Sequence, residues 1–410
     1  MKIRNAANTA GILLLVGSVA SALSRWYLVW LAQKLEGPEI LGVYGMLFAI
    51  ATPLFVAAQL GLRTVFLSKS TAYPWRSYIL LRAIGLTGGS GLLILIIFLT
   101  PTIPFYLGLG VLAIKIFDGI SDLYLAKIQY SNKLLKLGLI SFVASLLAFL
   151  FSTLGALTTQ SLTFAVGGAA IASLLSTLWA MSEAHRIPYH EETNESGTAD
   201  IFRSSFSVTS ADLLASLLLY LPVFYLSSTG DLRAVGIFVG VSYALTAADL
   251  VGSTVAKVLI TPLRNTFKVA GPLAAIGRSN SISAKALAWN APAAVVFILI
   301  GDVFFQWVYG PEFQLSPLVL GFFALAGVSI VVSHLQAVCL NVLNHYNRVA
   351  VSFGVACAVA ALTGAVLLSL GFDALIAGSA MAAAGSVGRT ATMFLGVQKA
   401  RVNDKSNQVR

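Results

Sequence analysis

Two basic side chains stand inside long apolar runs of this sequence. Arg25 lies in the run from Thr9 to Gln33, and Lys115 lies near the middle of "FYLGLGVLAIKIFDGISDLYL". A permanent charge at the centre of a membrane helix costs about 2.5–3.5 kcal/mol, so such residues usually face a water-filled cavity or pair. A guanidinium can bind two phosphate oxygens at once, whereas an ammonium acts as a point charge. The two residues therefore predict a binding site for a phosphorylated anion.

Each cation also has a simpler explanation. Arg25 can extend its side chain to the membrane interface, beside the aromatic residues Trp26 and Trp30. Lys115 precedes Asp118 by three residues, and this spacing lets the two side chains form an ion pair on one helix face. The sequence leaves both explanations open.

Carboxylates inside other apolar runs predict a second kind of site. Carboxylates in membrane helices can relay protons or bind Na⁺. Asp249 lies deep in its run and, together with Asp118, is predicted to bind a coupling ion, either H⁺ or Na⁺. Arg389 in the last run could instead form an ion pair with Asp249. Asp212 and Asp302 lie near the ends of their runs and are expected to reach the interface.

Several other chemistries have no support in the sequence. No G-x-x-x-x-G-K-[ST] motif is present, so we expect no ATP hydrolysis, and active transport would draw on an ion gradient. His334 and His345 have no acidic ligand nearby, and Cys339 and Cys357 lack metal-ligand spacing. We therefore expect neither a metal site nor a cofactor.

The composition indicates that these residues are carried by membrane-spanning helices. Hydrophobic residues make up 58% of the 410 residues, and charged residues only 10%. Soluble domains contain about 45–50% apolar and about 25% charged residues. A soluble protein of this size would need more charge to cover its surface, so the chain is predicted to be an all-α polytopic membrane protein.

The apolar runs are long enough to cross a bilayer. A hydrocarbon core about 30 Å thick requires a helix of about 20 residues. Breaking the chain at polar and Gly/Pro clusters predicts twelve spans. They cover residues 9–33, 40–62, 78–99, 104–126, 134–155, 160–182, 205–228, 234–257, 286–309, 316–341, 349–371 and 374–397.

The distribution of the 26 Lys and Arg residues predicts the orientation of these spans. With both termini in the cytoplasm, only Lys34 and Arg233 fall on the opposite side, and most of the others lie in cytoplasmic segments, as basic residues usually do. Four of them, around the junction of the second and third spans, are Arg63, Lys69, Arg76 and Arg82. The net charge of +10 is therefore explained by topology, and no nucleic-acid partner is expected.

The spans are expected to form two six-helix lobes. The long polar stretch from Glu183 to Arg203 falls between the sixth and seventh spans. The predicted organisation is an N-terminal lobe at 1–182, a cytoplasmic linker at 183–204, a C-terminal lobe at 205–398 and a basic cytoplasmic tail at 399–410. A weak similarity that aligns Gly42 with Gly236 favours lobes related by an axis along the membrane normal.

The N-terminus permits an alternative interpretation. Lys2 and Arg4, followed by "AGILLLVGSVA" and the small residues Ala20, Ser21 and Ala22, resemble a secretory signal with its cleavage site. Cleavage would leave eleven spans and remove the charge asymmetry. We therefore favour a retained first span.

Two stretches of the sequence resemble a known family. "LAQKLEGPEILGVYGMLFAIATPLFVAAQLGLRTVFL" and "WVYGPEFQLSPLVL" are similar to the second span and to the junction of the ninth and tenth spans in bacterial polysaccharide and O-antigen flippases. These flippases belong to the multidrug/oligosaccharidyl-lipid/polysaccharide exporter superfamily. Gly37-Pro38-Glu39 also has a purely structural role, because glycine ends one helix and proline suits the first turn of the next.

The resemblance implies a fold, a cargo and a set of partners. It implies twelve helices in two lobes around a V-shaped central cavity, and translocation of an undecaprenyl-diphosphate-linked oligosaccharide across the bacterial inner membrane. Basic residues line the first lobe in such flippases, which would assign Arg25, Lys115 and Arg63 to cargo binding, although Arg25 and Lys115 match no fixed family position. Membrane lipids, H⁺ or Na⁺ and other polysaccharide-assembly membrane proteins are the further partners implied.

Other functions remain alternatives. A multidrug exporter of the same superfamily would favour acidic cavity residues, and the peptidoglycan-precursor flippase resembles a fourteen-span chain. A membrane-embedded glycan polymerase or ligase would require a substantial periplasmic loop, whereas the polar loop that contains Asn194 is predicted to be cytoplasmic. We therefore expect a transporter and no enzyme.

Overall fold

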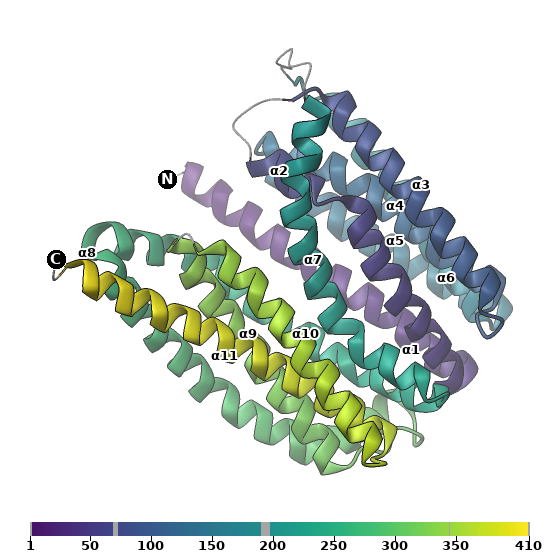
Figure 1. Cartoon of the computed structure of the whole chain (residues 1–410). Helices are drawn as coiled ribbons and strands as arrows, with labels where there is room; N and C mark the ends of the chain where they lie inside the picture. Colours follow the sequence, from purple (N-terminus) through teal and green to yellow (C-terminus); the bar gives the residue numbers. More distant parts are fainter. Residues whose placement is uncertain (1, 69–72, 190–196, 344, 409–410) are drawn as a thin grey trace. The chain divides into compact units, whose positions relative to one another are not determined.

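The chain folds into long α-helices, and the described residues contain no strand (Figure 1). The computed structural model describes residues 2–68, 73–189, 197–343 and 345–408, with side chains from residue 12 to residue 401 except 197 and 207. Lys69 and Asn194 lie outside the described residues. The elements are α1 (Lys2–Gln59), α2 (Leu62–Ser68), α3 (Trp75–Leu99), α4 (Phe105–Tyr130), α5 (Leu134–Thr159), α6 (Leu162–His185), α7 (Gly197–Ser228), α8 (Leu232–Tyr309), α9 (Pro317–Val342), α10 (Tyr346–Ser369) and α11 (Ala374–Gln408).

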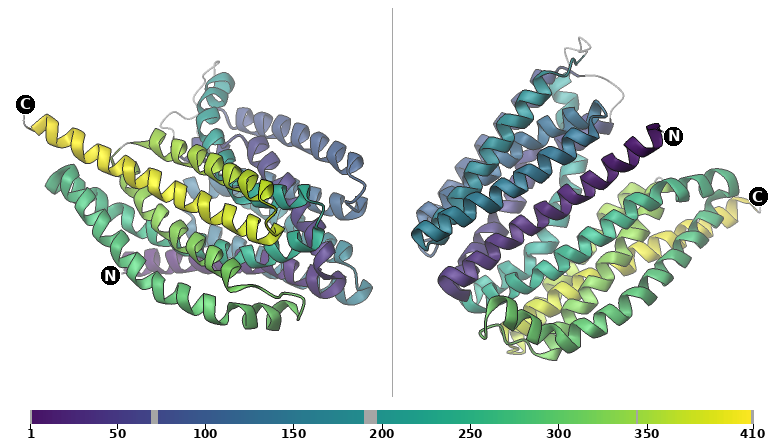
Figure 2. Two further views of the ribbon diagram at one scale, coloured as in Figure 1. Left: turned by 60° about the horizontal axis from the view of Figure 1, so that its bottom comes forward. Right: turned by 180° about the vertical axis from the view of Figure 1, so that it is seen from behind.

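Two of these helices contain a break at a Gly-Pro pair. Gly37 in α1 has φ +83°, and Gly271 in α8 has φ +80°. Glycine adopts this conformation without a steric penalty, and the following proline fits the first turn of a new helix. The chain therefore changes direction at both points, as the bend of α8 shows (Figure 2). Dividing α1 and α8 there yields one helical segment for each of the twelve predicted spans.

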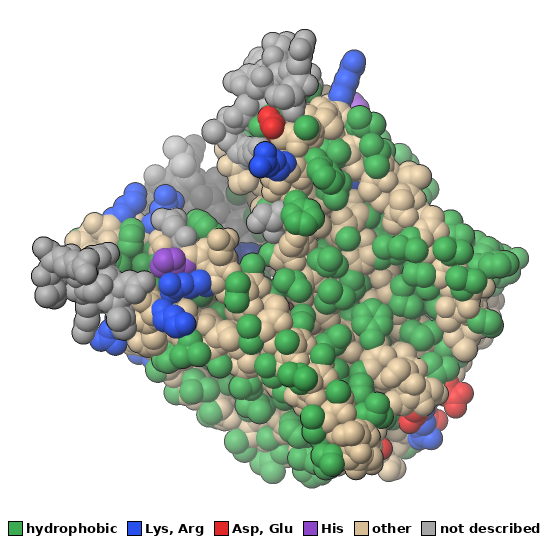
Figure 3. Space-filling view, viewed as in Figure 1, with side chains coloured by type: hydrophobic (Ala, Val, Ile, Leu, Met, Phe, Trp, Pro, Cys, Tyr) green, Lys and Arg blue, Asp and Glu red, His purple; other side chains and the backbone are tan. Residues whose placement is uncertain are grey.

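The surface of the helices has the character of a membrane protein. Within the described residues, eight helices are both long and apolar enough to cross a bilayer. Large apolar side chains are exposed on them, among them Phe98 on α3 and Trp307 on α8, and hydrophobic atoms cover much of the face in Figure 3. Such extensive apolar exposure would be unfavourable in water and is expected where acyl chains cover the protein. The predicted multi-pass membrane architecture is confirmed.

The chain divides into two compact units, Met1–Ser216 and Leu217–Arg410, with the boundary inside α7. In unit 1, α5 packs against α1 and α6, and α6 also packs against α4. In unit 2, α9 packs against α8 and α11, and α10 packs against α11.

Glycine allows a close contact between α5 and α6 in unit 1. A Cβ atom at Gly155 of α5 would lie 2.4 Å from the carbonyl oxygen of Phe164 on α6. A Cβ at Gly168 of α6 would lie 2.2 Å from the carbonyl oxygen of Phe151 on α5. The two backbones therefore pack directly against each other, as is common where membrane helices pack through small residues.

Candidate functional site

A network of charged side chains connects three helices of unit 1. Asp122 on α4 accepts a hydrogen bond from Arg63 Nη1 of α2 at 2.8 Å and one from Arg82 Nη2 of α3 at 3.1 Å. Arg63 Nη2 donates a second hydrogen bond, of 2.7 Å, to the Gln129 side-chain oxygen. One carboxylate therefore faces two guanidinium groups. Asp212 on α7 lies close enough to Asp122 for the two like charges to interact.

Arg82 is the member of this network that sequence reasoning missed. We counted it with the cytoplasmic cations, but only 3% of its surface is exposed, and its Nε and Nη1 atoms have no hydrogen-bond partner among the described residues. The position of Arg82 inside the predicted span 78–99 was the feature of the sequence that could have indicated its burial. Arg82 lies on the face of α3 that packs against α4, and its side chain there contacts Asp122.

Lys115 is held between α4 and the second segment of α1. Its Nζ donates a hydrogen bond of 2.8 Å to Thr52 Oγ1 and lies 4.8 Å from the centre of the Phe48 ring. Within the described part of the chain, no ion pair joins Lys115 to Asp118. The simpler explanation that the two residues form such a pair is therefore wrong, although their charges interact at longer range.

Asp118 points instead toward α6. Its Oδ1 accepts a hydrogen bond from Ser173 Oγ at 3.3 Å. Lys115 and Asp118 thus bond to two different neighbours of α4, because Thr52 belongs to α1 and Ser173 to α6. Among the described side chains, no carboxylate is in direct contact with the ammonium of Lys115.

Arg25 lies on the exposed surface of unit 1, and its charge interacts with that of Lys115. Its aromatic neighbour Tyr27 packs inward against α5, where its hydroxyl lies 2.8 Å from Thr153 Oγ1. The two cations that the sequence singled out therefore belong to one electropositive region of unit 1.

Unit 2 contains a different polar cluster. Asp249 Oδ1 on α8 lies 2.7 Å from His334 Nε2 on α9. Arg389 on α11 interacts electrostatically with Asp249, is 8% exposed, and stacks over the Phe353 ring at 4.3 Å. The sequence interpretation that His334 has no acidic residue nearby is wrong, because the packing of α8 against α9 joins residues 85 positions apart.

Gly252 makes the contact between Asp249 and His334 possible. It follows Asp249 by three residues on α8, and a Cβ atom at this position would lie 2.8 Å from His334 Cδ2. The absence of a side chain lets the imidazole lie against the α8 backbone and reach Asp249. The described residues include no group of three His, Cys, Asp or Glu side chains that could hold a metal ion.

Asp302 has a structural partner. Its Oδ1 accepts a 2.7 Å hydrogen bond from the backbone N–H of Leu315, and its Oδ2 accepts one of 2.8 Å from the Gln306 side chain. Asp302 therefore holds the segment between α8 and α9 in place, close to Gly310, where α8 ends.

The sequence was compared with family models and with curated proteins. No family model matches the sequence. The chain is 19% identical over 316 residues to the capsular polysaccharide biosynthesis protein CapF of Staphylococcus aureus, which covers 74% of this chain and 78% of CapF.

Solved structures resemble the chain over nearly its full length. The lipid II flippase MurJ in an inward closed conformation matches with a TM-score of 0.70 and 12% identity, over 94% of this chain and 87% of MurJ. The Vibrio cholerae MATE transporter VcmN matches with a TM-score of 0.63 and 15% identity, over 95% of both chains. An inward-facing multidrug resistance MATE family transporter of the MOP superfamily gives a TM-score of 0.67 at 12% identity, over 96% of both chains.

This chain has the fold of the MOP superfamily. The resemblance inferred from the two Gly-Pro-Glu segments is thereby confirmed at the level of fold, as is the all-helical architecture. Identities of 12% and 15% establish the fold alone.

Proposed function

We propose that this chain is a secondary-active flippase. Its cargo in this proposal is an undecaprenyl-diphosphate-linked oligosaccharide, moved across the inner membrane for the biosynthesis of O-antigen, capsule or exopolysaccharide. The electropositive region around Arg25 and Lys115 carries the proposal. The MOP fold and the similarity to a capsular polysaccharide biosynthesis protein support it.

The charges of unit 1 suit a diphosphate cargo. A diphosphate is very costly to move through hydrocarbon unless other groups replace its lost hydration. Arg25 is exposed and can bind two phosphate oxygens, and Lys115 contributes a second positive charge without a carboxylate in contact. Arg63 takes part less directly, because Asp122 and Gln129 already occupy its guanidinium.

The cluster of unit 2 is proposed as the coupling site. A proton that binds to Asp249 or His334 changes the charge of the pair beside Arg389 and Lys257, and so changes its energy inside the membrane. A histidine in direct contact favours H⁺ over Na⁺, because a protonated ring nitrogen donates and cannot ligate a cation. Asp118 is the second coupling candidate, and its carboxylate accepts a hydrogen bond from Ser173.

The connections between helices support a transporter rather than a polymerase or ligase. At the predicted periplasmic side, the described connections at 100–104, 160–161, 229–231, 310–316 and 370–373 are short. The fold is also shared with multidrug exporters, and a drug cargo is the second candidate. Cationic drugs would favour acidic cavity residues, whereas unit 1 carries surplus cations.

Deletion of the gene tests the proposed cargo. We expect undecaprenyl-diphosphate-linked oligosaccharide to accumulate in the cytoplasmic leaflet, and expression of the wild-type chain to restore surface polysaccharide. Leaflet position is measured by the accessibility of the sugar to an added glycosidase in oriented vesicles. Normal surface polysaccharide together with an unchanged lipid-linked pool would contradict the proposal, and drug sensitivity of the same strain would favour the exporter.

A further inference from the structure

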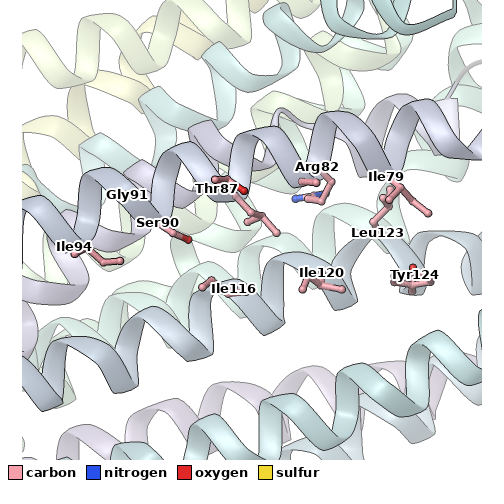
Figure 4. A pocket seen from close by; sticks show the side chains of 12 residues that line it. Ile79, Arg82, Thr87, Ser90, Gly91, Ile94, Ile116, Ile120, Leu123 and Tyr124 are labelled. Atoms are coloured by element: carbon pink, nitrogen blue, oxygen red, sulfur yellow. The ribbon is translucent and has the colours of Figure 1, made fainter.

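A groove runs between α3 and α4 in unit 1. It has a volume of about 610 Å³ and is lined mainly by apolar side chains, among them Leu86, Ile94, Ile116 and Ile120. The side chains converge from both helices toward the space between them (Figure 4). Ile79 and Ile94 line its two ends on α3, and by the helical rise they lie about 22 Å apart. That length exceeds one leaflet of a hydrocarbon core about 30 Å thick.

Arg82 is the charged residue of the groove lining. Its Nη2 atom bonds Asp122, whereas Nε and Nη1 are buried and have no partner among the described residues. Two unpaired nitrogen atoms of a buried guanidinium are unfavourable, because their N–H groups have lost hydration without gaining a hydrogen bond. Thr87 and Ser90 add hydroxyl groups to the same lining. The groove therefore offers hydrogen-bond donors for an anion beside an apolar channel.

The groove belongs to the lipid-facing part of α3. Leu80, Ile84 and Leu95 of the same helix are exposed, as are the lining residues Ile79 and Ile94. Arg82 lies in the second turn of α3, toward the helix end that is predicted to face the cytoplasm. An anion at Arg82 would therefore sit at the level of the cytoplasmic headgroups.

We propose that the groove binds an anionic phospholipid of the cytoplasmic leaflet. Its phosphate accepts a hydrogen bond from Nη1 of Arg82, and one acyl chain lies along the groove between α3 and α4. A phosphate is a suitable acceptor, because a charge-assisted hydrogen bond from a guanidinium to a phosphate oxygen is stronger than a bond between neutral groups. Arg82 shares Asp122 with Arg63, but the proposed lipid site does not depend on the identity of the cargo.

Two matched pairs of variants test the site. Arg82→Gln removes the donors, and Arg76→Gln removes an exposed arginine of the same helix as its control. Gly91→Leu fills the groove, because Gly91 lines it and a Cβ there meets no atom within 4 Å. Gly88→Leu is its control, since Gly88 has equal space and is not among the lining residues.

Native mass spectrometry of the purified full chain measures the binding. Phosphatidylglycerol and phosphatidylcholine with the same acyl chains are the two probes. We expect wild-type protein to prefer phosphatidylglycerol, and Arg82→Gln to weaken phosphatidylglycerol binding about tenfold, as loss of a charge-assisted hydrogen bond does. Gly91→Leu should weaken binding of both lipids, and the two control variants should match wild type.

Equal wild-type affinity for the two lipids, or unchanged binding in Gly91→Leu, overturns the proposal. Size-exclusion chromatography shows whether Arg82→Gln folds. If it does not, the proposal is tested by the lipid preference of the wild-type protein and by the comparison of Gly91→Leu with Gly88→Leu.

Discussion

Unit 1 and unit 2 place charges inside their membrane spans in different ways. In unit 1, Arg63 and Arg82 share Asp122, and Lys115 is held by a threonine hydroxyl, so positive charge is in excess. In unit 2, Asp249 contacts the imidazole of His334. An excess of fixed cations suits an anionic cargo, whereas a carboxylate beside an imidazole suits a proton. This difference motivates the proposal of cargo binding in unit 1 and of coupling in unit 2.

The largest effect is expected from Arg25→Ala in unit 1. The guanidinium is exposed and bonds to no side chain among the described residues, so protein abundance should stay near the wild-type level. Loss of two charge-assisted hydrogen bonds to a diphosphate should reduce export about 100-fold. Lys34→Ala, which removes an exposed cation from the same helix, is the control. Wild-type export by Arg25→Ala, measured as surface polysaccharide, would remove this residue from the cargo site.

The next effect is expected in unit 2. Asp249→Asn and His334→Gln should each reduce coupled transport about tenfold, because each loses one half of the proton-binding pair. Proton flux into proteoliposomes loaded with the lipid-linked cargo measures the effect. His345→Gln is the control, since burial and the neighbouring Arg348 lower the pKa of His345 and keep its ring neutral at neutral pH. A Na⁺-dependent flux that survives His334→Gln would contradict proton coupling at this pair.

Asp122→Asn should act on stability rather than on either site directly. The substitution leaves the buried guanidinium of Arg82 without a counter-ion, and loss of one partner of a buried ion pair costs about 3 kcal/mol. We expect a lower thermal unfolding midpoint in detergent, measured by fluorescence-detected size exclusion. The exposed Glu39→Gln should leave the midpoint unchanged. An unchanged unfolding midpoint in Asp122→Asn would show that the charge of Arg82 does not need Asp122 as its counter-ion.

The smallest effect is expected from Gly252→Ala. The added methyl group would displace the His334 ring, which weakens its contact with Asp249 and should lower coupled transport a few-fold. Gly277→Ala on the same helix adds a methyl group where nothing lies within 4 Å and should have no effect. Equal coupled transport by the two variants would show that transport does not depend on the position of the His334 ring.

The sequence by itself determined the membrane class, the twelve helical segments and the break at Gly37. These features follow from local properties, because the length of an apolar run and the chemistry of a Gly-Pro pair are read from neighbouring residues. It also identified Arg25, Lys115 and Asp249 as charges inside spans, since a single charge stands out in an apolar run.

Only the tertiary structure decided which partners these charges meet. Lys115 bonds Thr52 instead of Asp118, Asp249 bonds His334, and Arg82 lies buried against Asp122. A sequence places a residue along a helix, but its partner depends on which helix packs against that face and at what height. These contacts form between segments far apart in the chain, where small residues such as Gly252 let two helices approach.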